Sequence, residues 1–243
     1  MTNPFGNLTT SGLEESKDVL GGGSYLKDSG VYDGIIKLAF AGKSDSGARS
    51  LTVHIDIDGK EYRETLYVTS REGKHYYHPK GDTSKKSPLP GFTTANDLAL
   101  LSTGLSLGDQ TIEEKVVKLY DFDAKAEVPT KVEMLTEMIG KPIKLGIVRS
   151  VVDKNVKDAS GNYVPSGETK EENTIDKVFH AETGKTVAEF TAKIETAEFL
   201  GKWDEKNTGV TRQKAKGAGG KVGIPGAAPV AGGAKAPTKS LFG

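Results

Sequence analysis

The chain has 243 residues, and its 33 basic and 33 acidic residues give a formal net charge of zero at pH 7. It contains no cysteine, which excludes disulfides, thiolate metal sites and cysteine nucleophiles. No apolar run is long enough to cross a bilayer, and the N-terminus has neither the basic start nor the apolar stretch of a secretion signal. We therefore expect a soluble, cytoplasmic protein.

The charge is segregated along the chain. From residue 212 to the end there is no acidic residue, and there are six basic ones: Arg212, Lys214, Lys216, Lys221, Lys235 and Lys239. Subtracting these six leaves 27 basic against 33 acidic residues, so residues 1–211 carry −6 and residues 212–243 carry +6. Gly, Ala, Pro and Lys dominate residues 212–243, which offer little to bury, so we predict a disordered basic tail.

Residues 1–29 are rich in Gly, Ser, Thr and Asn and include the run Gly21-Gly22-Gly23. No Lys-Ser or Lys-Thr follows this run and no strand precedes it, which argues against a phosphate-binding loop. We expect an extended lead-in that ends where the first strand begins.

From residue 30 the pattern indicates antiparallel strands. Residues 31–41 form an apolar run with β-branched side chains, and residues 50–57 alternate strictly between apolar and polar. Asp58-Gly59 separates this second run from residues 61–69, and Asp-Gly between two alternating runs is a strong hairpin signal. An antiparallel meander is the firmest structural prediction.

The remaining elements alternate between short helices, strands and polar loops. We expect a polar excursion over 70–92, followed by a helix that is capped by 94–97 and ends near Thr103. A strand over 112–120 and a helix over 130–139, stopped by Gly140 and Pro142, come next. The last predicted elements are a strand over 143–152, a charged loop over 153–173, a strand over 174–180 and a helix over 195–206 that contains Trp203. Five or six short antiparallel strands with an interposed helix are typical of a Greek-key barrel, most commonly an OB-fold. The predicted class is thus mainly β, with an OB-like barrel and helical insertions over 30–211. The order lacks the βαβ alternation of a doubly wound α/β fold.

The excursion after the hairpin mixes cations with aromatic rings in a span too polar to form core. Single-stranded nucleic acid is bound by that combination, because cations follow the phosphates while rings stack on bases for about 1–3 kcal/mol each. The outer face of the hairpin, the loop before it and the start of the tail extend the candidate surface. Its residues are Lys43, Arg49, Arg63, Tyr67, Arg71, Lys74, Tyr76, Tyr77, Lys80, Lys85, Lys86, Arg212, Lys214 and Lys216. The alternative is a solvated loop whose tyrosines pack on the barrel.

Two sequence patterns could indicate a metal site, but neither is supported by its sequence context. His75 and His78 are spaced as ligands on a helix, but Gly73 and Pro79 disfavour a helix and no third ligand is evident. Asp58 followed by Glu72-Gly73-Lys74 resembles the metal-binding pattern of restriction-type nucleases. Such sites need rigid strands, whereas these acids occur in turn sequences. We therefore expect no catalytic or metal site and no cofactor.

Several longer strings resemble single-stranded DNA-binding proteins of tailed bacteriophages, with the similarity running from about Gly12 to Thr211. They are the opening Gly-Leu-Glu…Leu-Gly-Gly-Gly, Ser29–Tyr32, Lys60–Thr65, Pro88–Thr93, Tyr120–Asp123 and Asn162–Pro165. The resemblance implies an OB-fold that coats single-stranded DNA during phage replication and recombination in the host cytoplasm, without a cofactor.

The tail departs from that resemblance. Many replication proteins of this kind end in an acidic tail with an aromatic tip, whereas this tail is basic and keeps only the apolar tip Leu241-Phe242. We expect the tip to contact replication or recombination proteins. The tail either adds phosphate contacts or folds back onto the acidic body. Two other classes stay open: a structural or interaction protein whose basic tail contacts nucleic acid or an acidic partner, and a metal-dependent nuclease.

Overall fold

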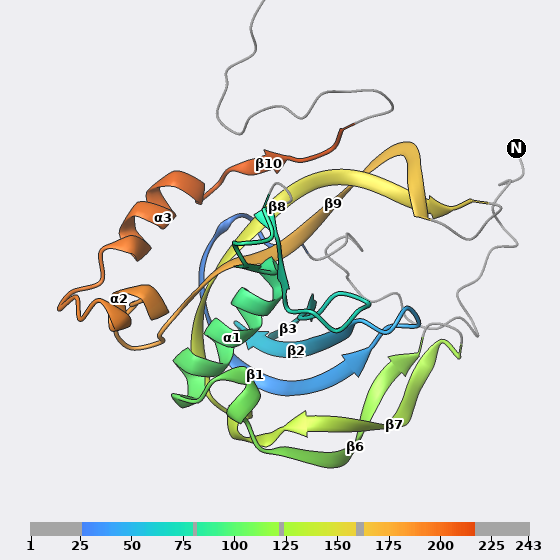
Figure 1. Cartoon of the computed structure of the whole chain (residues 1–243), viewed down its shortest axis with the longest axis horizontal. Helices are drawn as coiled ribbons and strands as arrows, with labels where there is room; N and C mark the ends of the chain where they lie inside the picture. The colour runs from blue at the N-terminus through green and yellow to red at the C-terminus, as the bar shows by residue number, and fades with distance from the viewer. Residues whose placement is uncertain (1–25, 80–81, 122–123, 159–162, 217–243) are drawn as a thin grey trace, which may run out of the picture.

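The structure is a computed structural model that describes residues 26–79, 82–121, 124–158 and 163–216 (Figure 1). Its main feature is an eight-stranded sheet in which every pairing is antiparallel except that of the last strand. The strands are β1 (Gly30–Lys43), β2 (Arg49–Ile57), β3 (Lys60–Tyr67), β6 (Ile112–Asp121), β7 (Ala126–Leu135), β8 (Pro142–Lys157), β9 (Tyr163–Phe179) and β10 (Thr211–Gln213). The prediction of a mainly β fold with helical insertions is confirmed.

The other elements are short. A second sheet pairs β4 (Tyr76–Tyr77) with β5 (Ser87–Pro88). The helices are α1 (Pro90–Thr103), α2 (Val187–Thr191) and α3 (Phe199–Asn207), with 3-10 turns η2 (Leu107–Asp109) and η3 (Thr136–Met138). None of the helices in the described part of the chain is both long and apolar enough to span a bilayer.

The long first strand curls the sheet around the core. Residues 30–35 of β1 pair with β8, whereas residues 35–43 pair with β2, and a register irregularity lies between Ile36 and Leu38. The strand order is β10-β8-β1-β2-β3, with β9 beside β8 and the β7–β6 hairpin beside β1. Among the described residues no ladder joins β3 to β9, so the sheet is open at these two edges.

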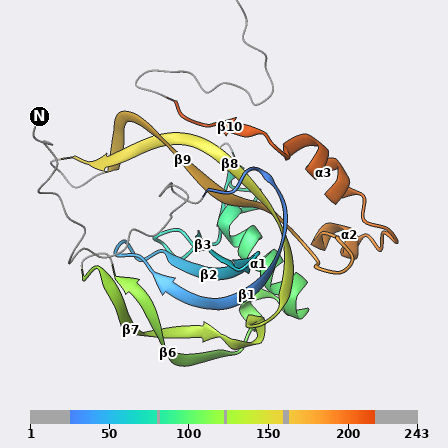
Figure 2. The same cartoon turned by 180° about the vertical axis from the view of Figure 1, so that it is seen from behind.

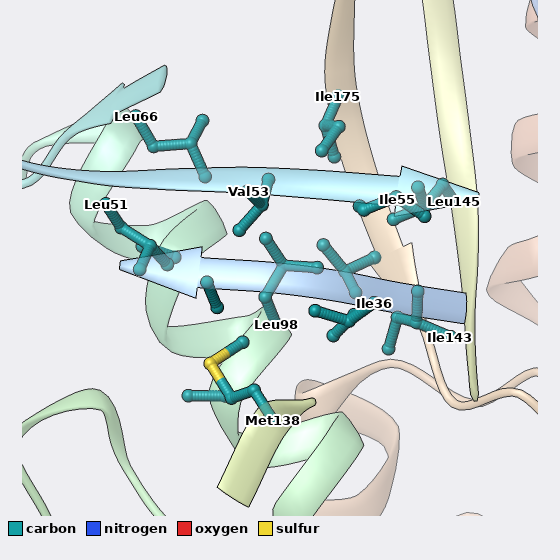
Figure 3. Packing of buried hydrophobic residues seen from close by; sticks show 14 of the residues in the cluster. Ile36, Leu51, Val53, Ile55, Leu66, Leu98, Met138, Ile143, Leu145 and Ile175 are labelled. Atoms are coloured by element: carbon teal, nitrogen blue, oxygen red, sulfur yellow. The ribbon is translucent and has the colours of Figure 1, made fainter. Parts of the chain in front are cut away.

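The predicted hairpin forms β2 and β3. Asp58 (φ 56°) and Gly59 (φ 73°) both adopt left-handed conformations, as a two-residue turn that matches the strand twist requires. The alternation in β2 places Leu51, Val53 and Ile55 in the core. Figure 3 shows these side chains meeting Leu98 of α1, which packs against the curled sheet.

The predicted helix over 130–139 is wrong. Residues up to Leu135 belong to β7, and only Thr136–Met138 form a helical turn. All ten residues of β6 pair with β7, and the buried Val132 and Met134 lie two residues apart, which is the strand period. Tertiary pairing therefore overrides a segment rich in helix formers.

The predicted charged loop over 153–173 is also wrong. β8 continues to Lys157 and β9 begins at Tyr163, so this span is the outer part of a long hairpin. Lys154 and Glu168 form a cross-strand ion pair of 2.8 Å there. A strand that is exposed on both faces has no apolar alternation, and its sequence therefore resembles a loop.

Helix boundaries differ from the prediction as well. α1 begins four residues before Thr94, with Pro90 in its first turn, where the missing proline N–H costs no hydrogen bond. α3 begins at Phe199, and α2 and β10 have no counterpart in the predicted elements. Trp203 lies in α3 as predicted.

Both ends of the described chain pack against the body. Lys27 of the predicted lead-in is buried, and its backbone N–H and carbonyl bond to the Asn173 side chain at 2.7 and 2.8 Å. Ser29, 3 % exposed, donates to the carbonyl of Val210 and accepts from the backbone N–H of Arg149. Lys27 and Ser29 of the predicted lead-in, and Lys214 and Lys216 of the predicted tail, thus bond to the body. The rest of the lead-in and tail lies outside the described residues.

One side chain bridges the open edges of the sheet. The Glu64 carboxylate on β3 accepts a 2.7 Å hydrogen bond from the backbone N–H of Ile175 on β9, and the same oxygen accepts from Tyr62. Burial raises the pKa of Glu64, and the bonds from Tyr62 and Ile175 offset only part of this rise. The protein therefore carries a costly carboxylate at the seam of its sheet.

Two substitutions of Glu64 are expected to change the free energy of unfolding differently. Glu64→Gln keeps an oxygen acceptor and removes the charge, so we expect the free energy of unfolding at pH 7 to stay equal or rise. Because the folded pKa is raised, the advantage of glutamine shrinks as pH falls through that pKa. Glu64→Ala leaves the Ile175 N–H without its acceptor and should cost about 1–3 kcal/mol. Urea unfolding at several pH values measures both, and a Glu64→Gln loss as large as that of Glu64→Ala would contradict the interpretation.

Candidate nucleic-acid interface

The outer face of the β1–β2–β3 sheet carries rings and polar groups. The register sets Phe40 opposite Thr52, Thr52 opposite Thr65, His54 opposite Arg63, and Ser50 opposite Tyr67. Because cross-strand partners share a face, these side chains lie together on the side away from the core. Arg63 and Tyr67, predicted from the sequence to lie on this outer face, are both on it.

The β6–β7 hairpin forms one wall of this face. Leu119 and Tyr120 of β6 line a cavity of about 240 Å³ together with residues of β1, β2 and β3. We call this cavity the saddle groove. Its lining residues are Phe40, Thr52, His54, Arg63, Glu64, Thr65, Leu119 and Tyr120.

Two basic side chains of the groove, His54 and Arg63, bond to the same carboxylate, that of Glu61. His54 is 4 % exposed and lies 3.1 Å from the Glu61 carboxylate, with its ring centroid 5.8 Å from that of Phe40. Burial lowers the pKa of His54 despite Glu61, so the imidazole is neutral at pH 7. Arg63 also bonds to Glu61, and about half of its side chain is exposed. The groove thus offers one guanidinium, oriented by a surface carboxylate that an incoming anion can displace.

Lys43 and Arg49 face each other at the other end of the β1–β2 pair. They line a second cavity of about 600 Å³ together with Lys131 and Ile112. Their register places them on the opposite face from Tyr67, although both groups lie at the same end of the sheet. The structure therefore brings these two cations near the groove without placing them in it.

The aromatic cluster of the 70–92 excursion packs largely on itself. The Tyr76 ring lies 4.6 Å from the Lys86 ammonium, with the rings of His75 and His78 at its edges. His75 also contacts Phe92 of α1 at 4.9 Å. Of the two tyrosines, Tyr77 is the more exposed, at 48 %.

The cations of this excursion are mostly paired. Lys74 lies 3.3 Å from Glu72, Lys85 lies 3.7 Å from Asp82, and Arg71 is exposed. Lys80 lies outside the described residues. The rings of the excursion thus contact one another and α1, whereas the predicted site residues Arg71, Lys74, Tyr77, Lys85 and Lys86 are exposed.

The patterns that suggested a metal are not assembled. Asp58 and Glu72 lie beyond opposite ends of β3, whose eight residues span about 25 Å. Glu72 instead pairs with Lys74. Across the described residues, no group of three or more His, Asp or Glu side chains is placed to hold a metal ion.

The first tail residues are tied to the body. Arg212 bonds through both terminal nitrogens to Asp176 and also to Asn207, and Asp176 accepts a 2.8 Å bond from the Trp203 indole. Burial alone would raise the pKa of Asp176, but the bonds from Arg212 and Trp203 outweigh it and hold the pKa below its usual value. Arg212 is therefore engaged in packing α3.

Lys214 and Lys216 follow β10 and are exposed. Their backbone N–H groups bond to the Val151 carbonyl and the Asp153 carboxylate, both at 2.9 Å. Burial raises the pKa of Glu64, which lines the saddle groove, and the charge of Lys214 lowers it in small part, so Lys214 lies near one edge of the groove.

No family model matches this sequence, and no curated protein does either.

Two hairpin arms flank the β1–β2–β3 face. The β6–β7 hairpin and the outer halves of β8 and β9 project to the same side of the molecule in both views (Figures 1 and 2). Each carries an exposed tyrosine: Tyr120 on β6, 42 % exposed, and Tyr163 on β9, 69 % exposed. The Lys157 ammonium lies 5.4 Å from the Tyr163 ring. Each arm thus presents a ring on that side of the molecule.

Sequence reasoning missed four of these residues as site members. Phe40 and His54 lie in segments that were used only to predict strands with one face in the core. Tyr120 and Tyr163 were named only as parts of the sequence strings that carry the family resemblance. Lys157 and Tyr163, a cation and a ring on either side of a short polar turn, were the detectable signal. The pair could be recognised only if the polar span 153–173 had been predicted as a hairpin and not as a loop.

Proposed function

We propose that the protein binds single-stranded DNA across the β1–β2–β3 face and is not an enzyme. One observation carries the proposal: Phe40, Arg63 and Tyr67 share one sheet face, and the β6–β7 hairpin adds Tyr120 beside it. Rings that stack on bases and a guanidinium that contacts phosphate are what a sequence-tolerant single-strand site needs.

The strand order supports an OB-like barrel. In that fold the first strand pairs with the second and the fourth, the fifth strand lies beside the fourth, and a helix follows the third. Here β1 pairs with β2 and β8, β9 lies beside β8, and α1 follows β3. The β6–β7 hairpin is then an insertion before the fourth strand. OB-folds bind oligonucleotides on the face of their second and third strands and on the loops that border it, which corresponds to the saddle groove and the β8–β9 arm.

We assign the phosphate contacts to Arg63, with Lys43 and Arg49 at the end of the sheet, and the stacking contacts to Tyr67, Tyr120 and Tyr163. The biological role that fits this chemistry is the coating of single strands in phage replication and recombination, in the host cytoplasm. The tip Leu241-Phe242 lies outside the described residues, and its contact with partner proteins remains part of the proposal.

Binding to fluorescent oligo-dT across a salt series tests the function. We expect binding at low salt that weakens as salt rises, with a slope of log K against log salt of about −0.7 for each phosphate contacted. A chain ending at Lys216 keeps the tail residues that the structure describes and removes Lys221, Lys235 and Lys239. It should retain most of the affinity and show a smaller slope.

Each alternative predicts a different outcome. Absence of binding to dT of any length would refute the proposal. Loss of all affinity on truncation at Lys216 would favour a structural protein that contacts nucleic acid only through its tail. Cleavage of the oligonucleotide that depends on Mg²⁺ or Mn²⁺ would identify a nuclease.

A further inference from the structure

β6 forms an outer edge of the sheet. Among the described residues it pairs only with β7, and both views show it at the margin of the molecule (Figures 1 and 2). Ile112 and Val116 on this strand are 54 % and 63 % exposed. A ten-residue edge with exposed apolar side chains is a template for pairing with another strand.

The side chains along this edge are self-complementary. One face of β6 carries, in order, Ile112, Glu114, Val116, Lys118 and Tyr120. When two copies of the strand pair antiparallel about Val116, Val116 meets its own counterpart and Glu114 meets Lys118 of the second copy, twice. Ile112 meets Tyr120 of the second copy, also twice. Every pair on this face is then apolar with apolar or acid with base, a combination that stabilises antiparallel strands.

The neighbouring registers are disfavoured by like charges. On an edge strand only alternate residues point their N–H and carbonyl groups outward, so the register can change only in steps of two. One such step places Lys115 opposite Lys115 of the second copy. The step in the other direction places Glu113 opposite Asp121. The charged side chains of β6 therefore disfavour pairing in the neighbouring registers. They favour the register centred on Val116 with a second copy of the same chain.

We propose that β6 is a self-association surface through which two copies join their sheets by antiparallel β6–β6 pairing. The two-fold axis of such a pair is perpendicular to the sheet, so corresponding faces of the two copies point the same way. Leu119 and Tyr120 both line the saddle groove; Leu119 alternates with the paired residues, whereas Tyr120 is one of them. The proposal does not depend on DNA binding.

Sedimentation velocity of the full chain without DNA, from about 1 to about 200 µM, tests self-association, because an interface of one strand pair is small and weak. We expect a monomer–dimer equilibrium in the wild-type protein. E114K and K118E each convert two attractive pairs into two repulsive ones and should weaken the dimer at least about tenfold. The double variant E114K/K118E restores both attractive pairs and should recover the dimer.

Mixing the two single variants gives the sharpest result. The E114K chain presents lysines at positions 114 and 118, whereas the K118E chain presents glutamates at both. The mixture should therefore form a heterodimer although each variant alone is monomeric. A matched control is Glu168→Lys, which breaks an exposed ion pair with Lys154 on the other arm and should leave the dimer intact.

Folding is checked separately by circular dichroism and urea unfolding, because Glu114 also contacts Lys131 at 2.9 Å within its own chain. Within the described part of the chain Lys118 takes part in no ion pair. A fold defect confined to E114K would therefore still leave K118E as a test of the dimer. A wild-type protein that is monomeric at every concentration would overturn the proposal. So would single variants that dimerise like the wild type, or a mixture that stays monomeric.

Discussion

Tyr67→Ala is expected to weaken oligo-dT binding by about 5- to 150-fold, because one base stacked on an aromatic ring is worth about 1–3 kcal/mol. Tyr67 lies at the end of β3 on the β1–β2–β3 outer face and is 53 % exposed, so its ring is available to a base and contributes little to the core. Fluorescence anisotropy at one fixed salt concentration measures the change. The urea unfolding curve should remain close to that of the wild type.

Two further variants test whether the loss of oligo-dT affinity is specific to the β1–β2–β3 face. Phe190→Ala removes an aromatic side chain of similar exposure, 44 %, from α2 at a distance from the face, and should not change affinity. Tyr77→Ala removes the exposed tyrosine of the 70–92 excursion and tells whether that element also contacts DNA. Equal losses for Tyr67→Ala and Phe190→Ala would contradict the placement of the binding surface.

Arg63→Ala should behave differently from Tyr67→Ala. Loss of one phosphate contact reduces the salt slope by about 0.7, whereas loss of a stacking ring lowers affinity without changing the slope. The comparison therefore separates the electrostatic from the stacking contribution within one face. Arg63→Lys keeps the charge and should preserve most of the slope.

Gly91→Ala is expected to lower the free energy of unfolding by about 2–3 kcal/mol, the usual cost of inserting a methyl group into a packed site. A Cβ at Gly91 would overlap the Tyr67 carbonyl oxygen and lie 3.0 Å from its carbonyl carbon, and neither atom can move without shifting β3. At about 2–4 °C per kcal/mol for a protein of this size, the melting temperature should fall by about 5–10 °C. Calorimetry or thermal circular dichroism gives the value.

The chain supplies a matched control for this substitution. Gly201 also lies in a helix, but a Cβ there meets nothing within 4 Å. Gly201→Ala should stabilise the protein by about 0.5–1 kcal/mol through helix propensity alone. Because Gly91 abuts the backbone of Tyr67, we also expect Gly91→Ala to reduce dT affinity. A Gly91→Ala protein as stable as the wild type would show that α1 does not pack on β3 as described.

The sequence was informative where one face of an element is buried. The alternation in residues 50–57 and the Asp58-Gly59 turn predicted β2, β3 and the outer position of Arg63 and Tyr67. It failed where both faces are exposed, as in the β8–β9 arm, whose Lys154–Glu168 pair has no apolar period. It failed again at residues 130–135, where pairing with β6 decides between helix and strand.

The candidate site was predictable only in part for the same reason. Arg63 and Tyr67 follow from the strand period, but Phe40 and Tyr120 join them through contacts between strands far apart in the chain. The Arg212–Asp176 bond likewise joins residues 36 positions apart, and a purely basic composition at the C-terminus gave no sign of it. Charge segregation identified a cationic tail but not how far the body extends into it.

The Ser29 contact sets an order of events during synthesis. Its side chain donates to the carbonyl of Val210, and its own carbonyl accepts from the N–H of Gly209, across a separation of 181 residues in the first case. At about 5–20 residues per second, a ribosome needs roughly 10–35 s to bring the second partner out after the first. β1 can pair with β2 early, but the segment before β1 that contains Ser29 has to wait for nearly the whole body to emerge. Because this contact joins the two ends of the described chain, it can form only late in synthesis. Until then the nascent protein exposes the edge of β8 that β10 later covers.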